Sequence, residues 1–340
     1  MYNILVSSLV LVATFLFTWY LTKRWIPAAK YFGLVGKDLN KYGHPEVAEG
    51  GGFAVIIGLA VGLFLYLFLK ACFGSVSHLT EIYAVISTVV LAGFIGFTDD
   101  ILGWKKGIRQ RRKVVLSSIL ALPLMTLVLI YPQYNSFSSW NIPLWVYALI
   151  IVPVGIIGAS NAINMVAGYN GLEAGLGIII FATLAAQAVM MRESWIAYIS
   201  LIGVATLFGF LIFNWYPAKI FPGDSLTYPM GALIGALVIL GNMEIFGALL
   251  FPLYFLDFIL FIRARFFDHM KEVEAFGIPD KKEHLEMPYD KIYDSCHLAI
   301  LIQKKIRGYA TERGVVVTLY LIQVAISFIV ILIANILHIL

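Results

Sequence analysis

The sequence predicts an all-α, polytopic integral membrane protein that forms one domain over residues 1–340. Three observations support this fold class. Hydrophobic residues make up 61% of the chain and charged residues only 13%, whereas a soluble domain has about 45–50% apolar residues. About ten apolar runs approach the roughly 20 residues that a helix needs to cross a bilayer. Nearly all Lys and Arg residues fall on alternate connections between these runs.

The first apolar run, Asn3–Thr22, is followed rather than preceded by basic residues, Lys23 and Arg24. This polarity is opposite to that of a cleaved signal peptide, so we expect a spanning helix with its N-terminus outside. Polar or turn-forming residues separate the later runs, of which the eighth is the shortest. The nine further predicted spans are, in order, Gly51–Ala71, Glu81–Phe97, Val114–Tyr131, Leu144–Ser160, Leu172–Met191, Trp195–Phe213, Leu226–Leu240, Glu244–Ile262 and Val315–Leu340.

The basic residues test this topology, because cytoplasmic loops collect positive charge. Of the 24 Lys and Arg residues, 22 lie on the odd-numbered connections, and only Lys70 and Arg192 lie on the even ones. The last connection is a long basic loop at 263–314. The odd-numbered face is therefore predicted to be cytoplasmic, with both termini outside.

The same face carries the unusual polar residues of the chain. They stand at helix ends or in odd connections, and they are Asp38, Glu49, Asp99, Asp100, Asn161, Asn164, Asn170, Glu173 and Asp224. The net charge of +4 is small and gives no indication of nucleic acid as a partner. The two cysteines, Cys72 and Cys296, indicate neither a zinc site nor a disulfide framework. The sequence therefore predicts cytosolic chemistry carried by carboxylates and amides.

Two adjacent carboxylates, Asp99 and Asp100, end the third predicted span in the sequence GFTDD. The basic run WKKGIRQRRK, which ends at Lys113, follows shortly after. Paired carboxylates at a membrane boundary are costly unless a cation or a function compensates them. The alternative is a solvated helix end beside basic residues that bind anionic lipid. The pattern alone leaves both interpretations open.

The segment NAINMVAGYNGLEAG, at 161–175, is harder to explain as ordinary helix capping. Asn161 and Asn164 are three residues apart and share one helix face. Glycines, beginning with Gly168, break the helix around Asn170. Amide oxygens can ligate a hard cation, and a glycine-rich turn lets backbone groups approach a phosphate or a base.

The segment FNWYPAKIFPGDS, at 213–225, places Asp224 where the eighth predicted span begins. Aspartate is a favoured N-cap, so capping is one interpretation. The other is a metal ligand, because Mg²⁺ prefers one or two carboxylates together with phosphate oxygens and water. Asp224 with Asn164 would suit such a site.

A polar stretch at 36–52, containing GKDLNK and PEVAEGGG, leads into the second predicted span. Here Lys37 and Lys41 could hold phosphates, and Glu49 could hydrogen-bond a sugar.

In their order along the chain, the motifs described above resemble those of the polyprenyl-phosphate N-acetylhexosamine-1-phosphate transferases, and most closely the dolichyl-phosphate N-acetylglucosaminephosphotransferase branch of eukaryotes and archaea. The motifs that carry the resemblance are DLNK (38–41), FTDDILG (97–103), NAINMVAGYNGLEAG, FNWYPAKIFPGDS and LEMPY (285–289).

The resemblance implies transfer of GlcNAc-1-phosphate from UDP-GlcNAc to a polyprenyl (dolichyl-type) phosphate. The products would be UMP and GlcNAc-pyrophosphoryl lipid, the first intermediate of N-glycan assembly on a lipid. It also implies a Mg²⁺ cofactor, with Mn²⁺ as an alternative, and a homodimer as a candidate assembly. The location would be the plasma membrane of an archaeon or an endoplasmic reticulum membrane.

The resemblance also implies roles for individual residues. Asn164 and Asp224 match metal ligands. Asp99, Asp100, Lys113 and Asn161 match catalytic positions, with Lys113 at the pyrophosphate and Asp99 as base or positioning group. A strong base is not required, because a lipid phosphate is already ionised at neutral pH. The implied UDP-sugar contacts are Leu39, Asn40, Glu49, Gly168, Asn170, Glu173 and Phe221.

One departure concerns the last long loop. The eukaryotic branch has an Arg-His-Arg type motif there, and residues 263–284 of this chain contain no such cluster. The residues that could contact the sugar or phosphates instead are Arg263, Arg265, His269 and His284. Each of them also fits a solvated basic loop. The same reaction with another UDP-HexNAc, for a cell-envelope glycan, therefore stays open.

Two other function classes are compatible with a polar membrane protein. A transporter or flippase would place polar residues near the middle of the bilayer and would show inverted repeats. The sequence shows neither pattern. A non-catalytic subunit that binds nucleotide or lipid would tolerate loss of Asp99, Asp100 or Asp224, and the sequence retains all three.

Overall fold

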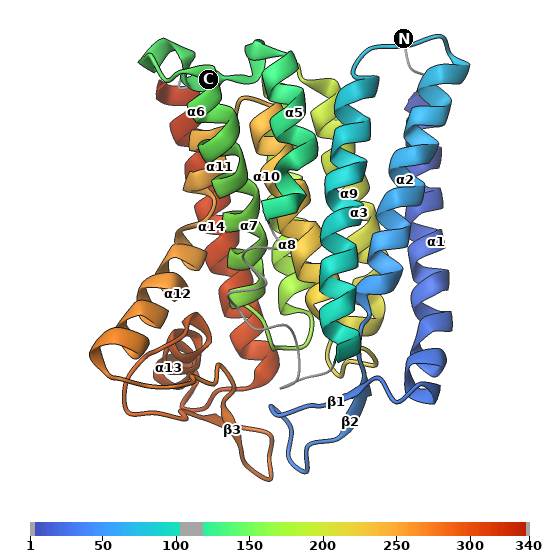
Figure 1. Ribbon diagram of the computed structural model, residues 1–340. Helices are drawn as coiled ribbons and strands as arrows, with labels where there is room; N and C mark the ends of the chain where they lie inside the picture. The colour runs from blue at the N-terminus through green and yellow to red at the C-terminus, as the bar shows by residue number, and fades with distance from the viewer. Residues whose placement is uncertain (1–3, 103–117, 338–340) are drawn as a thin grey trace.

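A computed structural model describes residues 4–102 and 118–337 of the chain. Long helices run side by side as a bundle (Figure 1). Helix α1 (Ile4–Tyr31) begins, and helix α14 (Glu312–Leu337) ends, at the same end of this bundle. The two short hairpins and helix α13 (Ser295–Arg307) gather at the opposite end, which we call the loop end.

Within the described residues, seven helices are long and apolar enough to cross a membrane. They match the first, second, third, fifth, sixth, seventh and tenth predicted spans and confirm the all-α, polytopic class. Besides α1 and α14 they are α2 (Gly52–Cys72), α3 (Leu79–Leu102), the continuous run of α6 (Leu144–Val146), η4 (Tyr147–Ile151) and α7 (Val152–Met165), α8 (Leu172–Met190) and α9 (Ser194–Asn214).

The other three predicted spans differ from this pattern. The fourth corresponds to η1 (Ser118–Ala121) and α5 (Leu122–Ile130), and the eighth is α10 (Asp224–Leu240), both shorter than the seven. Short helical turns η2 (Pro132–Tyr134) and η3 (Ser136–Trp140) follow α5. The total of ten spans stays a prediction.

The expectation of one unbroken ninth span is wrong. The run divides into α11 (Glu244–Leu249) and α12 (Pro252–Ile262). Proline lacks the backbone N–H that a helix interior needs, so Pro252 fits the first turn of a new helix rather than the middle of an old one. Figure 1 shows α12 beside the bundle near the loop end.

Helix α10 lies at the centre of the bundle, and every residue from 225 to 240 is buried. It packs closely against α3 and α7 through glycines. A Cβ atom at Gly96 would overlap the backbone of Asp224, and one at Gly231 would overlap the backbone of Ser160. Small residues let helices approach to this degree inside a membrane protein. As a result, the ends of α3 and α7 meet the start of α10.

At the loop end, β1 (Val35–Lys37) pairs in antiparallel fashion with β2 (Glu46–Ala48). This hairpin is fastened to the segment that precedes α10. The N–H of Phe221 donates to the carbonyl of Ala48 at 2.7 Å, and the N–H of Gly51 donates to the carbonyl of Phe221 at 2.9 Å. The start of the chain therefore helps to position the start of α10.

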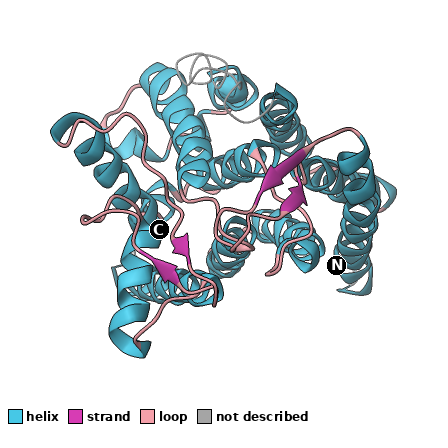
Figure 2. Cartoon of the chain, turned by 90° about the horizontal axis from the view of Figure 1, so that it is seen from below, coloured by secondary structure: helices cyan, strands magenta, loops and turns pink. Residues whose placement is uncertain are grey.

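The long basic connection at 263–314 is folded. It contains η5 (Arg263–Phe267), a short hairpin of β3 (Ile278–Pro279) and β4 (Leu285–Glu286), and α13. Figure 2, a view onto the loop end, shows both hairpins lying over the helix ends.

Candidate active site

The first turn of α10 is capped by the carboxylate of Asp100, in the last turn of α3. The Asp100 side chain accepts the backbone N–H groups of Asp224 at 2.8 Å and Ser225 at 3.1 Å, and the Ser225 hydroxyl at 2.5 Å. The N–H groups of a first helical turn have no partner inside the helix, so a carboxylate here satisfies them. Gly223 occupies the N-cap position with φ 69°. The capping role that the sequence allowed for Asp224 therefore belongs to Asp100.

Asn164, in the last turn of α7, joins Asp224 directly. Its amide nitrogen donates to Asp224 Oδ1 at 2.6 Å and to Thr227 Oγ1 at 2.9 Å. One turn earlier, Asn161 accepts a hydrogen bond from the Tyr228 hydroxyl at 3.2 Å. The structure thus brings together the two residues predicted as metal ligands and places Asn161 against the same helix.

These side chains could hold a metal only together with other ligands. Among residues 4–102 and 118–337, no three His, Cys, Asp or Glu side chains are arranged around a common metal position. The carboxylates of Asp100 and Asp224 and the amide of Asn164 are nevertheless the oxygen donors that Mg²⁺ uses beside phosphate oxygens and water. The donor set fits a Mg²⁺ shared with a phosphate substrate.

Glu49 and Phe221 lie next to this cluster. A Cβ atom at Gly36 would stand 3.3 Å from both the Glu49 carboxylate and the Phe221 ring, so the two side chains flank the same backbone position. Burial, and then the negative charge of Asp224, raise the pKa of the Glu49 carboxyl. Glu49 is therefore close enough to respond to the charge at Asp224.

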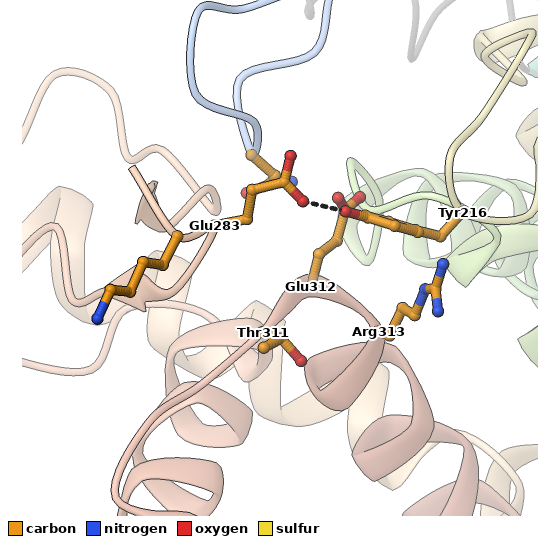
Figure 3. A pocket seen from close by; sticks show the side chains of 7 residues that line it. Tyr216, Glu283, Thr311, Glu312 and Arg313 are labelled. Carbon is orange, nitrogen blue, oxygen red and sulfur yellow. Dashed lines mark hydrogen bonds between the residues drawn. The ribbon is translucent and has the colours of Figure 1, made fainter. Parts of the chain in front are cut away.

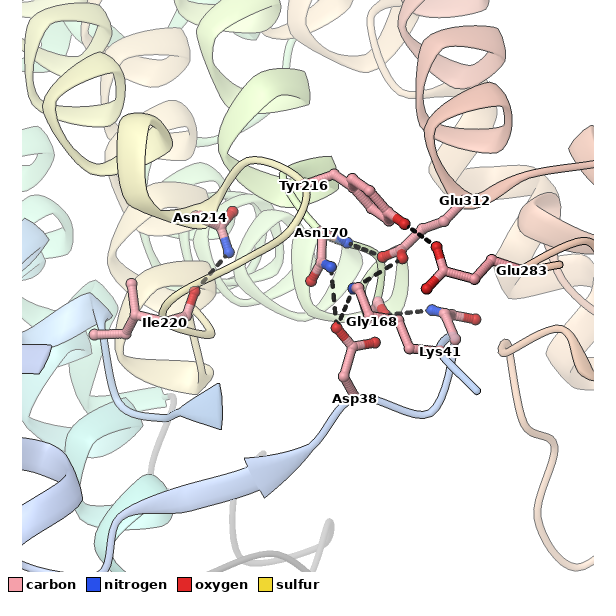
Figure 4. A network of polar contacts seen from close by, with 10 residues as sticks. Asp38, Lys41, Gly168, Asn170, Asn214, Tyr216, Ile220, Glu283 and Glu312 are labelled. Carbon is pink, nitrogen blue, oxygen red and sulfur yellow. Dashed lines mark hydrogen bonds and ion pairs between the residues drawn. The ribbon is translucent and has the colours of Figure 1, made fainter. Parts of the chain in front are cut away.

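A second polar cluster holds the turn between α7 and α8 (Figure 4). The backbone N–H of Asn170 donates to Glu312 at 2.9 Å, and its side-chain amide donates to Asp38 at 3.0 Å. Lys41 pairs with both carboxylates, with Glu312 at 3.1 Å and also with Asp38. We call these four buried residues, Asp38, Lys41, Asn170 and Glu312, the Lys41 network.

The same turn is supported around Gly168, whose φ is 111°. Its N–H donates to Glu173 at 2.9 Å, and its carbonyl accepts the Asn40 amide at 3.1 Å. The Phe276 ring lies so near that a Cβ atom at Gly168 would stand 2.7 Å from it. Asn40, Gly168, Asn170 and Glu173, all predicted as UDP-sugar contacts, are therefore neighbours.

A cavity of about 390 Å³ opens beside the Lys41 network (Figure 3). The cationic groups of Lys41 and Arg313 lie 4.6 Å and 4.4 Å from the centre of the Tyr216 ring. The Tyr216 hydroxyl donates to Glu283. Burial, and then the hydrogen bond with Glu283, raise the pKa of Tyr216 to about 12. The cavity is lined by Asn40, Tyr216, Lys282, Glu283, Thr311, Glu312 and Arg313.

Four residues of the long basic loop were predicted as possible sugar or phosphate contacts, and their interactions are with other parts of this loop. They are Arg263, Arg265, His269 and His284. Arg263 lies 3.5 Å from the Asp268 carboxylate, and Arg265 donates to backbone carbonyls of the following turn. The His284 ring packs on Tyr309 at 4.6 Å, and His269 is exposed. Their described contacts are therefore local to the loop.

Three predicted site residues remain to be placed in the structure. Asp99 is half-buried in the last part of α3, next to the capping Asp100, and Leu39 is half-buried between the buried Asp38 and Asn40. Lys113 lies outside the described residues.

Sequence reasoning did not select Asp38, Lys41 and Glu312 as a unit. The first two stand in the DLNK motif, so a signal existed for them. Glu312 is separated from Lys41 by 271 residues, and a glutamate at the start of a helix is ordinary. Nothing in the local pattern connects the two.

The sequence model of glycosyl transferase family 4 matches residues 82–242 of this chain. The matched region includes Asp100, Asn164, Asn170 and Asp224. A protein of Saccharolobus solfataricus is 37% identical over 258 residues, which are 73% of this chain and 75% of that protein. The chain belongs to glycosyl transferase family 4. The resemblance inferred from the motifs is thereby confirmed.

Relatives of this chain are named for more than one reaction. The Saccharolobus protein, and a Sulfolobus acidocaldarius protein that is 29% identical over 85% of this chain and 89% of its own length, are provisionally named UDP-N-acetylglucosamine–dolichyl-phosphate N-acetylglucosaminephosphotransferases. A phospho-N-acetylmuramoyl-pentapeptide-transferase of Prochlorococcus marinus is 31% identical over 48% of each chain.

Proposed function

We propose that this chain transfers GlcNAc-1-phosphate from UDP-GlcNAc to a polyprenyl phosphate of the dolichyl type. The products are UMP and GlcNAc-pyrophosphoryl lipid, which begins lipid-linked oligosaccharide assembly. The observation that carries the proposal is the convergence of Asp100, Asn164 and Asp224 where three helices meet. These residues lie inside the family-matched region, and two archaeal relatives are named for this reaction.

In this reaction an oxygen of the lipid phosphate forms a bond to the β-phosphorus of UDP-GlcNAc. The bond from that phosphorus to the bridging oxygen breaks, and UMP leaves with the electron pair. No proton has to be removed from an ionised lipid phosphate, so the protein has mainly to position the groups and to balance negative charge. A base at Asp99 is then optional, and a positioning role is sufficient.

Mg²⁺, or Mn²⁺ in its place, is the cofactor that we propose for this site. Asp224 and Asn164 would hold it, and Asp100 keeps the start of α10 in place beside them. When bound, the ion would supply positive charge to the pyrophosphate oxygens. The chain's own contribution is to hold the carboxylate of Asp224 and the turn around Asn170 at one end of the bundle.

We further propose that the loop end faces the cytosol of an archaeal cell, with both termini outside. The distribution of Lys and Arg supports this orientation. The start of α1 and the end of α14 at the opposite end of the bundle are consistent with it. The absence of an Arg-His-Arg motif from residues 263–284 favours one alternative, the same transfer with a different UDP-HexNAc.

The test is UMP release by the purified protein in detergent, with UDP-GlcNAc and dolichyl phosphate, and with Mg²⁺ present or chelated by EDTA. Release that requires both the lipid and the metal supports the proposal. Release only from another UDP-sugar would keep the reaction and change the substrate. No release with any nucleotide sugar would favour a transporter or a binding subunit instead.

A further inference from the structure

We propose that Asp38, Lys41 and Glu312 are positioning residues for the nucleotide, because they hold the turn at 168–171 in its binding shape. The inference rests on the proposed function, since it assigns this turn to the UDP moiety. It adds residues of the Lys41 network, which is distinct from the cluster of Asp100, Asn164 and Asp224. Their action runs through Asn170.

Two carboxylates hold Asn170 from different directions. Glu312 accepts its backbone N–H at 2.9 Å, and Asp38 accepts its side-chain amide at 3.0 Å. A carboxylate can only accept hydrogen bonds, so Asp38 obliges the amide to turn its nitrogen toward it. The carbonyl oxygen of Asn170 is then left to accept the imide N–H of a uracil base bound at this turn.

Lys41 stabilises the two carboxylates inside the protein. Its side chain is 9% exposed, and the side chains of Asp38 and Glu312 are 4% and 3% exposed. Two buried carboxylates would repel each other, and buried charges are tolerated only when they are paired. Lys41 pairs with both carboxylates, so its charge is engaged within the protein. We therefore assign it to support of the turn rather than to binding of a phosphate.

The network also links segments that are far apart in the sequence. It joins the loop between β1 and β2, the turn after α7 and the start of α14 (Figure 4). Tyr216 adds a fourth segment, because Lys41 and Arg313 both lie against its ring. A change at the start of α14 should therefore alter nucleotide binding through the turn.

The experiment measures the steady-state kinetics of UMP release by full-length variants, with UDP-GlcNAc and dolichyl phosphate varied separately. For Glu312→Gln we expect the KM for UDP-GlcNAc to rise about 10-fold, the loss expected for one charged hydrogen bond. The kcat and the KM for the lipid should change less than about 2-fold, because the interaction serves binding and not the transition state. Lys41→Met should raise the same KM further, since it leaves two carboxylates without their cation, and Lys41→Arg should restore most of the affinity.

The matched control is Glu286→Gln, which removes an exposed carboxylate that pairs with Lys304 on the same end of the molecule. It should leave every constant unchanged. If Glu312→Gln does not fold, Asp38→Asn tests the same network at its other carboxylate, because the backbone N–H of Asn170 keeps Glu312 as its partner. Unchanged KM values would overturn the inference. An equal rise in the KM for both substrates, together with a comparable fall in kcat, would overturn it as well. An inactive unmodified protein would instead overturn the proposed function, and the inference with it.

Discussion

The two polar clusters at the loop end are built in different ways. Asp100 meets α10 through two backbone N–H groups and a hydroxyl, all within one helical turn. The Lys41 network joins side chains from the loop between β1 and β2, the turn after α7 and the start of α14, and Lys41 bonds Glu312 271 residues away. The first cluster depends on how closely three helices pack, and the second depends on pairing of buried charges. We expect the first to control chemistry and the second to control nucleotide affinity.

The largest effect expected is the loss of activity in Asp224→Asn. The amide oxygen of asparagine can still accept the hydrogen bond from Asn164, so the helix junction should persist. Loss of the carboxylate should reduce UMP release at least ~10²-fold, as removal of one preorganised electrostatic group does in other active sites. Asp290→Asn, at an exposed aspartate, is the control. Activity within about 3-fold of the unmodified protein would remove Asp224 from the reaction.

A smaller effect is expected from Gly168→Ala in the second cluster. Gly168 has φ 111°, and its new Cβ atom would meet the Phe276 ring. Backbone strain of this kind costs about 1–3 kcal/mol, so both thermal stability and affinity for UDP-GlcNAc should fall. Gly158→Ala is the matched control, because a Cβ atom there meets nothing within 4 Å in the middle of α7. Equal behaviour of the two variants would show that the turn adapts freely.

Asp100→Ala tests the helix cap on which the first cluster depends. Loss of the cap should lower the free energy of unfolding by about 1–2 kcal/mol, which thermal unfolding in detergent would detect. Asp100→Asn should lose less, because its amide oxygen still accepts an N–H of α10. A fully stable alanine variant would mean that packing alone holds the start of α10.

The smallest effect concerns Glu49 and pH. Its pKa is raised in the folded protein, so the folded chain holds this proton more tightly than the unfolded chain does. That contribution to stability is present below the ordinary value of 4.5 and is lost as pH rises through the higher folded pKa. Glu49→Gln imitates the protonated form, so its stability relative to the unmodified protein should increase with pH, by less than about 1 kcal/mol. The check is the unfolding midpoint of both proteins as a function of pH. A difference between them that stays constant with pH would show that burial and the charge of Asp224 do not raise the pKa of Glu49.

Much of the candidate site could be predicted from the sequence. Asn164, Asp224 and Asp100 stand at the ends of apolar runs, and polar residues are too costly there to be accidental. Helix ends that lie on one side of a membrane are close in space, which is why these residues could be grouped before their contacts were known. The interruption at Pro252 was missed because the surrounding residues, from Glu244 to Ile262, are apolar almost without a break.

The sequence by itself determined the membrane class, the positions of most spans and the family, because hydrophobic length and short motifs are properties of local segments. Tertiary structure decided that Asp100 caps α10 while Asp224 faces Asn164, because a cap supplied by another helix depends on how α3 packs against α10. It also decided the partnership of Lys41 with Glu312. Contacts between distant segments depend on how the helices pack, and no local pattern records that packing.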